Sequence, residues 1–309
     1  MTAIVLRRIG WSVLVVWFVV TATFALVAVA PGSPVHAMVG PHASQRTKDL
    51  VSAQYCVDEG LVTRYGCWLA TLGDGLGTSF RTERKVTDIL GDRVWPTVQL
   101  ALAAIVLQLL IGIPLGVVSA VRRGRWPDRL ASGFTVLAQS APAFFVATVL
   151  VYLLAFRFEL FPLGGYGDGF WDRLHHLVLP ALTLATLGVA YYARVIRSEL
   201  GDTLGQDYVR TARAKGLPER TVVWRHALRP ALPPLVTVIG LDLGMLVGGA
   251  VVIEQIFSWP GLGREMLQAI LDVDMPVILG IVLVTAVAIA IANLAVDLVQ
   301  LWLDPRLRE

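Results

Sequence analysis

Six long stretches with at most one charged residue each dominate this chain. A helix needs about 20 mainly apolar residues to cross a bilayer, and all six stretches reach that length. Charged residues make up only 16% of the chain, against about 25% in soluble domains. We therefore predict an all-α membrane protein with six transmembrane helices. The stretches are Ile9–Ala30, Val94–Val121, Leu130–Phe156, Leu174–Ala193, Pro230–Ile253 and Met275–Leu303.

Charge and motif content argue against two function classes. The net charge of +3 comes from residues in the polar segments between the stretches, whereas a nucleic-acid binder concentrates its charge on a soluble face. None of the three lysines (Lys48, Lys85 and Lys215) follows a glycine, so the phosphate-binding sequence GxxxxGK[ST] is absent. We expect no nucleic-acid partner and no ATP hydrolysis by this chain. No arrangement of residues suggests a catalytic site, so we do not expect an enzyme.

Basic residues predict which way the chain crosses the membrane. Six helices place both termini on one side, and that side receives 16 of the 26 basic residues. Cytoplasmic loops are enriched in Lys and Arg, so both termini are predicted to be cytoplasmic. The first stretch could instead be a signal peptide cleaved after Ala28–Ala30. A signal core spans only about 7–15 residues, and this uncharged stretch has 22, so we predict an uncleaved helix.

These boundaries divide the chain into four regions. Residues 1–30 hold the N-terminus and first helix, and residues 31–93 form an external segment. Residues 94–303 hold helices two to six, and residues 304–309 form a cytoplasmic tail. The external segment is too long for a plain loop and is expected to have structure of its own.

The chain has two cysteines, Cys56 and Cys67, and both lie in the external segment. A disulfide persists on the oxidising side of the membrane, and closing this loop would stabilise the segment by about 3 kcal/mol in the entropic treatment. The alternative is two free thiols. A metal or redox site would need more ligands or a CxxC spacing, so we expect a disulfide and no metal.

The cytoplasmic loop 194–229 is too polar to cross the bilayer and is predicted to be helical in two pieces. The first piece should end at Lys215–Gly216, because a cation in the last turn and a following glycine favour helix termination. Pro218 suits the first turn of the second piece. On composition alone, the loop could be a basic amphipathic hairpin lying on anionic lipid.

The sequence of this loop suggests a more specific role. Residues 207–217 read DYVRTARAKGL, and residues 225–229 read RHALR. These strings resemble the cytoplasmic EAA loop of ABC importer permeases, in the form found in the dipeptide/oligopeptide permease family. Further strings resemble that family in the same order along the chain. They are Ala30–Pro34, Gly73–Ser79, Thr97–Leu102, Ile111–Gly116, Ser140–Phe145, Phe161–Gly167, Glu254–Gly263, Asn293 with Asp297, and Asp304–Arg306. The long external segment makes the B-type subunit the closer match.

The resemblance implies the transmembrane domain of a type I ABC importer in the bacterial cytoplasmic membrane. Such a permease pairs with a second, C-type permease and with two ATP-binding subunits, which hold the ATP and Mg²⁺. A substrate-binding protein docks from outside, and alternating access moves the solute. The EAA loop inserts into an ATPase as a coupling helix. The residues that match or flank its motif are Asp207, Tyr208, Arg210, Thr211, Ala212, Arg213, Lys215 and Gly216.

This chain departs from the family pattern at two positions. The general motif begins with Glu where this chain has Arg210, which puts any Glu-specific contact in doubt, and Pro230 replaces the common Asn after RHALR. The small side chain of Ala212 is consistent with close docking of the loop on a partner. The arginines could pair with carboxylates on a partner.

Two further sites have competing interpretations. The family resemblance favours an external gate at Glu254, Phe257, Trp259, Pro260 and Gly261, with a plain loop anchor as the alternative. Asp242 lies near the middle of the fifth stretch, and an intramembrane carboxylate marks a transport pathway by default. The favoured alternative is a hydrogen bond to a neighbouring helix, because ATP-driven uptake needs no coupling-ion site.

The resulting functional hypothesis is a permease subunit that forms half of the pathway of an ATP-driven dipeptide or oligopeptide importer. The same architecture also serves haem, nickel and glutathione in this family. An ion-coupled secondary transporter is a weaker alternative, because such proteins need coupling residues and often show inverted repeats. A membrane scaffold without transport activity would leave the external segment and the family motifs unexplained.

Overall fold

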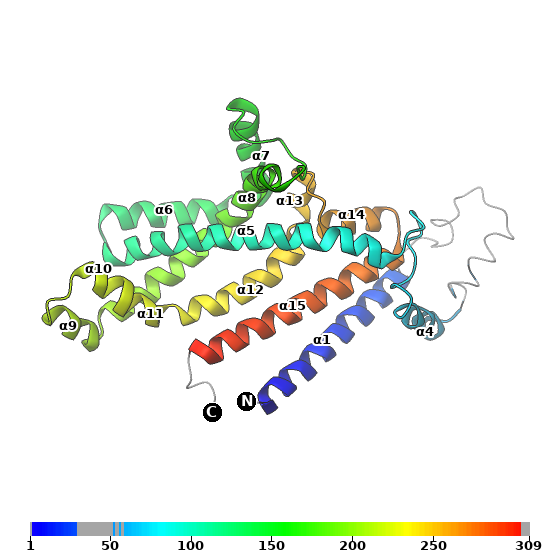
Figure 1. Ribbon diagram of the computed structural model, residues 1–309, viewed down its shortest axis with the longest axis horizontal. Helices are drawn as coiled ribbons and strands as arrows, with labels where there is room; N and C mark the ends of the chain where they lie inside the picture. The colour runs from blue at the N-terminus through cyan, green and yellow to red at the C-terminus, as the bar shows by residue number, and fades with distance from the viewer. Residues whose placement is uncertain (1, 30–51, 53–55, 57–58, 304–309) are drawn as a thin grey trace. The chain divides into compact units, whose positions relative to one another are not determined.

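The computed structural model describes residues 2–29, 52, 56 and 59–303. The stretches Ala30–Pro34 and Asp304–Arg306, the tail 304–309 and most of residues 31–58 lie outside the described residues. The described chain contains helices and no β-strand (Figure 1), which confirms the all-α prediction. It forms two compact units, one of residues 1–97 and 260–291 and the other of residues 98–259 and 292–309.

Within the described residues, four helices are long and apolar enough to cross a membrane, and they contain the described parts of four of the six predicted stretches. They are α1 (Thr2–Val29), α5 (Val86–Val121), α8 (Phe170–Leu204) and α15 (Met275–Leu303). Helix α5 begins at Val86, before the predicted membrane stretch, and contains all of it. Likewise α8 extends eleven residues beyond the predicted end at Ala193.

The third predicted stretch is not one helix, which corrects the sequence prediction. It contains α6 (Trp126–Ser140), α7 (Ala143–Leu150) and the π-helix η1 (Val151–Arg157), and the two halves are bent by 106°. The break falls at Ala141–Pro142. Proline disfavours helical geometry in the residue before it, and Ala141 is accordingly extended, with ψ 126°.

The fifth predicted stretch is also divided. It contains the end of α11 (Leu228–Ala231), the apolar helix α12 (Pro233–Gly249) and α13 (Val251–Ile256). Proline lacks a backbone N–H and is best tolerated at the start of a helix, and Pro233 occupies that position in α12.

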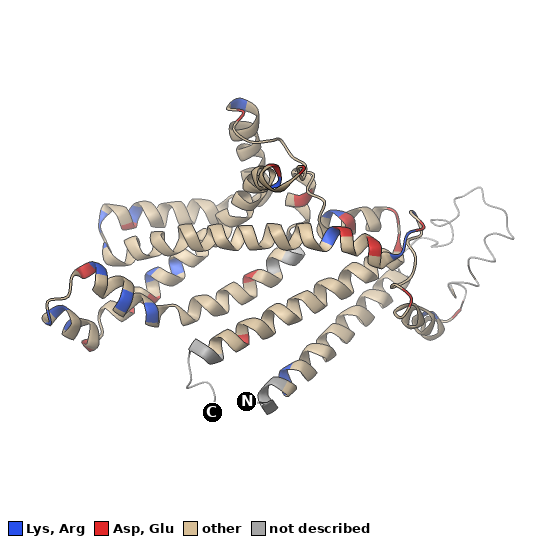
Figure 2. Ribbon diagram, in the orientation of Figure 1, with Lys and Arg blue, Asp and Glu red and all other residues tan. Residues whose placement is uncertain are grey.

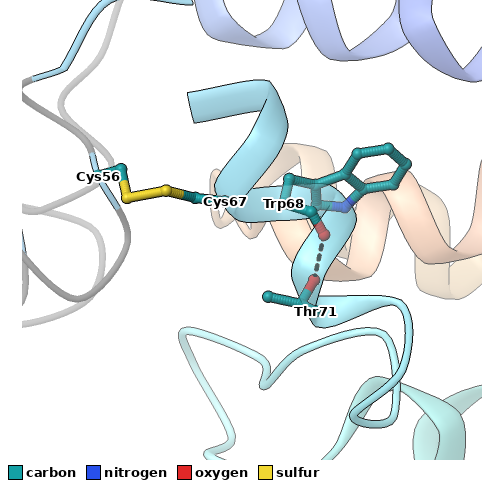
Figure 3. Close-up of a disulfide and its surroundings, with 4 residues drawn as sticks. All are labelled: Cys56, Cys67, Trp68 and Thr71. Carbon is teal, nitrogen blue, oxygen red and sulfur yellow. Dashed lines mark hydrogen bonds between the residues drawn. A yellow bond between two sulfur atoms is a disulfide. The ribbon is translucent and has the colours of Figure 1, made fainter. Parts of the chain in front are cut away.

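The first unit combines α1, α4 (Leu61–Thr71), the first turns of α5, α14 (Leu262–Leu271) and the first half of α15. Phe24 of α1 packs edge-on against Tyr65 of α4, with 5.1 Å between ring centroids. The disulfide Cys56–Cys67 ties the preceding chain to α4 (Figure 3). Beside it, the Thr71 hydroxyl donates to the Trp68 carbonyl at 2.7 Å. The described external segment therefore contains a helix that packs on α1.

The second unit holds the rest of α5, the helices from α6 to α13 and the end of α15. Two glycines let α5 approach α8 closely. A Cβ added at Gly116 would lie 2.7 Å from the Ala193 carbonyl oxygen and from Ile196 Cβ, and one at Gly112 would lie 2.9 Å from Tyr192 Cβ. Small residues permit this close contact between membrane helices.

Charge is distributed unevenly within the second unit (Figure 2). The helices that run between its ends are almost free of charged residues, whereas Lys, Arg, Asp and Glu gather at the α5–α6 turn and from the end of α8 to α11. This charged region includes the loop whose sequence resembles a coupling loop.

Candidate functional site

The loop 194–229 forms a folded helical segment rather than a loose connection. Helix α8 continues through its first eleven residues and ends at Leu204. Gln206 is extended, with ψ 152°, and caps α9 (Asp207–Ala214). After a turn follow α10 (Glu219–Thr221), the π-helix η2 (Val222–Ala227) and α11. The prediction of two helical pieces was wrong, because α8 and α9 are separated at Gly205–Gln206.

Helix α9 has one buried and one exposed face. Val209 and Ala212 are buried and join a core with Val222, Val223 and Ala227 of η2. The residues Asp207, Tyr208, Arg210, Thr211, Arg213, Lys215 and Gly216 are exposed. Ala212 therefore lies on the opposite side from the residues with which it was grouped, and its small side chain permits close packing within this chain.

The turn after α9 has the geometry of a Schellman motif. The Leu217 N–H donates to the Ala212 carbonyl at 3.4 Å, and the Gly216 N–H donates to the Arg213 carbonyl at 2.9 Å. Gly216 has φ +77°, a conformation that glycine adopts without steric cost. The predicted end at Lys215–Gly216 agrees with this helix end.

An ion pair spans this turn. The Arg213 guanidinium donates two hydrogen bonds to the Glu219 carboxylate, at 3.1 and 2.7 Å. Because this hydrogen-bonded cation favours the ionised carboxylate, the pKa of Glu219 lies below its ordinary value. Both side chains are about half exposed, so the pair contributes little to stability and mainly orients α10 against α9.

A second ion pair, which sequence reasoning missed, anchors α8 just before α9. Arg197 donates to both carboxylate oxygens of Asp128 on α6, at 2.6 and 3.0 Å. The Gly124 N–H donates to the same carboxylate at 2.8 Å. Asp128 is buried, so its charge is compensated by three donors. In the sequence, the one available signal for this ion pair was that Asp128 is a single acid among the four arginines of residues 122–129.

The candidate gate residues of the second unit pack against the loop 164–166. Glu254, Phe257 and Trp259 are all buried. The Gly165 N–H donates to the Phe257 carbonyl at 2.8 Å, and Trp259 meets Tyr166 edge-on, with 4.9 Å between ring centroids.

This aromatic group continues to charged and polar side chains. The Arg173 guanidinium lies 4.3 Å from the Tyr166 ring centroid. The Tyr166 hydroxyl also donates to Gln99 at 2.6 Å. Trp259 therefore packs within a cluster of aromatic, charged and polar side chains.

The other two gate candidates, Pro260 and Gly261, belong to the first unit. Gly261 is the extended N-cap of α14, and the following Leu262 N–H donates to the Thr97 hydroxyl at 2.8 Å. These two residues therefore define where α14 begins.

Asp242 lies on α12 within the second unit and is partly exposed. The Tyr192 hydroxyl of α8 donates to its carboxylate at 3.0 Å, and Gln108 of α5 lies close to it. Both interpretations of Asp242, as a pathway residue and as a link between helices, are compatible with these contacts.

Comparison with known families places the charged helical segment in context. The family described as binding-protein-dependent transport system inner membrane component matches residues 112–309. This range includes α8, α9 and the segment through α11. The chain belongs to this family. This match and the relatives that align over almost the full chain together confirm the predicted assignment to ABC importer permeases of the dipeptide/oligopeptide group.

Among the curated relatives of this permease is the probable D,D-dipeptide transport system permease protein DdpB of Escherichia coli. It is 38% identical, and the alignment covers 98% of this chain and 97% of the relative. The oligopeptide transport system permease protein AppB of Bacillus subtilis is 35% identical, with 99% of each chain covered. A putative peptide transport system permease protein of Brucella abortus is 38% identical, with coverage of 100% and 99%.

A solved structure with a similar fold comes from inward-facing conformations of the MetNI methionine ABC transporter. The TM-score is 0.59 at 19% identity, over 70% of this permease and 96% of that chain. At this identity the likeness concerns the fold alone. It confirms the predicted fold of a type I ABC importer transmembrane domain.

Proposed function

We propose that this permease forms half of the translocation pathway of an ATP-driven importer of dipeptides or oligopeptides. The names of the relatives, which include a probable D,D-dipeptide and an oligopeptide permease, support a peptide substrate. Haem, nickel and glutathione remain the alternative solutes for this architecture. The observation that carries the coupling role is the exposed outer face of α9, with its DYVRTARAKGL sequence.

In this proposal α9 is the coupling helix. Tyr208, Arg210 and Lys215 are exposed and are available to a partner, whereas Arg213 is paired with Glu219. Arginine forms bidentate pairs with carboxylates, so we expect an acidic groove on the ATPase. Ala212 acts indirectly, by letting α9 pack closely on η2.

The buried Asp128–Arg197 pair would make this segment move as one body. It joins α6 to α8 less than three helical turns before α9. A displacement of α9 would then move α6 and α8 together, because a packed, hydrogen-bonded connection does not deform gradually.

The remaining parts of the importer would be other chains. A second permease would complete the pathway, two subunits would bind ATP and Mg²⁺, and an external protein would deliver the solute. The basic α5–α6 turn and α8–α11 segment would face the cytoplasm, as would both termini. The external segment with its disulfide would face the binding protein, and the gate candidates Glu254, Phe257, Trp259, Pro260 and Gly261 would lie on the same side of the membrane.

Photo-crosslinking in cells tests this proposal. A photoreactive residue at position 208, which is exposed on α9, should capture an ATP-binding subunit. The matched control is position 170, which is exposed at the opposite end of α8 and should capture none. A mild-detergent pull-down read by mass spectrometry should recover a second permease and the ATPases. Recovery of those ATPases with no crosslink from position 208 would refute the coupling role of α9.

A further inference from the structure

Three polar side chains from three helices meet inside the second unit. They are Gln108 of α5, Tyr192 of α8 and Asp242 of α12, which we call the polar trio. Asp242 accepts a hydrogen bond from Tyr192 at 3.0 Å, and Gln108 lies close to the same carboxylate. Gln108 and Tyr192 are buried, whereas Asp242 is partly exposed. A ligand could therefore approach the trio from the side of Asp242.

The trio lies in apolar surroundings. Tyr192 belongs to a buried apolar core with Leu235 and Val238 of α12, and Leu109 and Ile239 pack against that core. Removing a carboxylate from water is costly unless a positive group or several donors compensate it. Only neutral groups donate to Asp242, and no Lys, Arg or His of the described chain forms an ion pair with it.

One acceptor of the trio is also unused. The Gln108 Oε1 atom is buried and has no hydrogen-bond partner among the described residues. A carboxylate can only accept, so the NH₂ group of Gln108 must face Asp242, and this orientation turns Oε1 away. A buried polar atom without a partner costs about 1–3 kcal/mol and calls for an explanation.

Close packing against Gly188 of α8 fixes the position of Gln108. A Cβ added at Gly188 would lie 2.2 Å from Gln108 Nε2 and 2.3 Å from its Cδ. The amide therefore occupies space that any larger residue on α8 would fill. This close approach fixes the Gln108 amide in the interior of the unit.

We propose that Gln108, Tyr192 and Asp242 recognise the free ammonium group of the transported peptide. This inference rests on the proposed function. An ammonium group has three N–H donors and one positive charge. It supplies the charge that Asp242 lacks and the donor that Gln108 Oε1 lacks, while the Tyr192 oxygen keeps lone pairs that can accept the third N–H. A sodium ion also suits oxygen ligands, and the experiment below separates the two.

Direct binding to the assembled complex tests the inference. The complex recovered in the pull-down is placed in lipid nanodiscs in choline chloride, without the binding protein. Binding of radiolabelled alanyl-alanine is compared with that of N-acetyl-alanyl-alanine, which lacks the ammonium group. In the wild type we expect N-acetylation to weaken binding at least tenfold. In Asp242→Asn this ratio should fall to about one, whereas the control Asp297→Asn, another carboxylate on a membrane helix, should keep it.

Two milder variants guard against misfolding. Tyr192→Phe keeps the ring and removes one donor, and Gln108→Leu removes the unpaired oxygen with little change in volume. Each should lower the ratio severalfold, and thermal unfolding of the same sample reports any loss of folding. A purely structural role would reduce both measurements together.

The outcomes separate this inference from the function on which it rests. A recovered complex whose Asp242→Asn variant retains the wild-type ratio overturns the inference alone. The inference is also overturned if the wild type shows no preference for the free amine, or if sodium chloride displaces alanyl-alanine from the wild type. Failure to recover ATP-binding subunits overturns the proposed function instead.

Discussion

Removal of the charge at Asp128 should weaken the connection between α6 and α8. Asp128 accepts two hydrogen bonds from Arg197, at 2.6 and 3.0 Å, and one from the Gly124 N–H at 2.8 Å. Breaking a buried ion pair by removing one partner costs about 3–5 kcal/mol. The Arg197 side chain is 36% exposed, so water can rehydrate it and the cost is smaller. We expect Asp128→Asn to destabilise the permease by about 2 kcal/mol, since hydrogen bonds to charged groups contribute about 1.5–3 kcal/mol each and Asn can keep some of them.

The assay is thermal unfolding of the full chain in detergent, followed by size-exclusion chromatography with fluorescence detection. A loss of about 2 kcal/mol corresponds to a fall in Tm of about 3 °C for a protein of this size. The matched control is Arg194→Gln on the same helix. Arg194 donates to Gln139 in an exposed hydrogen bond, so its substitution should cost below about 0.5 kcal/mol.

A double-mutant cycle decides whether the pair itself is responsible. If Asp128 and Arg197 interact, the variant with both Asp128→Asn and Arg197→Gln should be less destabilised than the sum of the single variants. Effects that simply add would refute the reasoning. The same variants, assembled with their partners, should also lower transport per ATP hydrolysed if the pair makes α6 and α8 move together.

Three further predictions concern other parts of the chain. Gly116→Ala should destabilise the permease by about 1–3 kcal/mol through overpacking, whereas Gly10→Ala, where an added Cβ meets nothing within 4 Å, should not; thermal unfolding distinguishes them. Reduction of the disulfide should lower the local stability of α4 by about 3 kcal/mol, seen as faster amide exchange in that helix, and unchanged exchange would contradict this. In an NMR titration with labelled carboxyl carbons, Glu219 should titrate below its ordinary 4.5, and replacing its arginine partner with Gln should raise that value. Because the folded-state pKa is lowered, the small stabilisation from this pair is complete at neutral pH and is lost as the pH falls through the lowered value.

The gate candidates illustrate how far sequence resemblance reaches. It grouped Glu254, Phe257, Trp259, Pro260 and Gly261 as consecutive parts of one motif. The structure shows the first three buried in one unit and the last two at the N-terminal end of α14 in the other. A motif identifies residues, but their division between two packed units depends on contacts with distant parts of the chain.

The coupling loop shows a similar limit. Its helix end at Lys215–Gly216 was predictable, because glycine and a preceding cation act through the local backbone. The inward orientation of Ala212 was not predictable from the sequence. It depends on η2, which packs against the face of α9 that carries Ala212.

The sequence by itself determined the membrane class, the helical fold and the family. Bilayer thickness sets a minimum apolar length that can be counted along the chain, and the family motifs are contiguous strings. Only the tertiary structure decided the 106° break in the third stretch, the pairing of Asp128 with Arg197 and the meeting of Gln108, Tyr192 and Asp242. Proline marks a place where a helix can break, but packing against neighbouring helices sets the angle. Polar side chains that lie far apart in sequence acquire partners only when helices pack, because each buried polar group must be compensated by whatever the fold brings within reach.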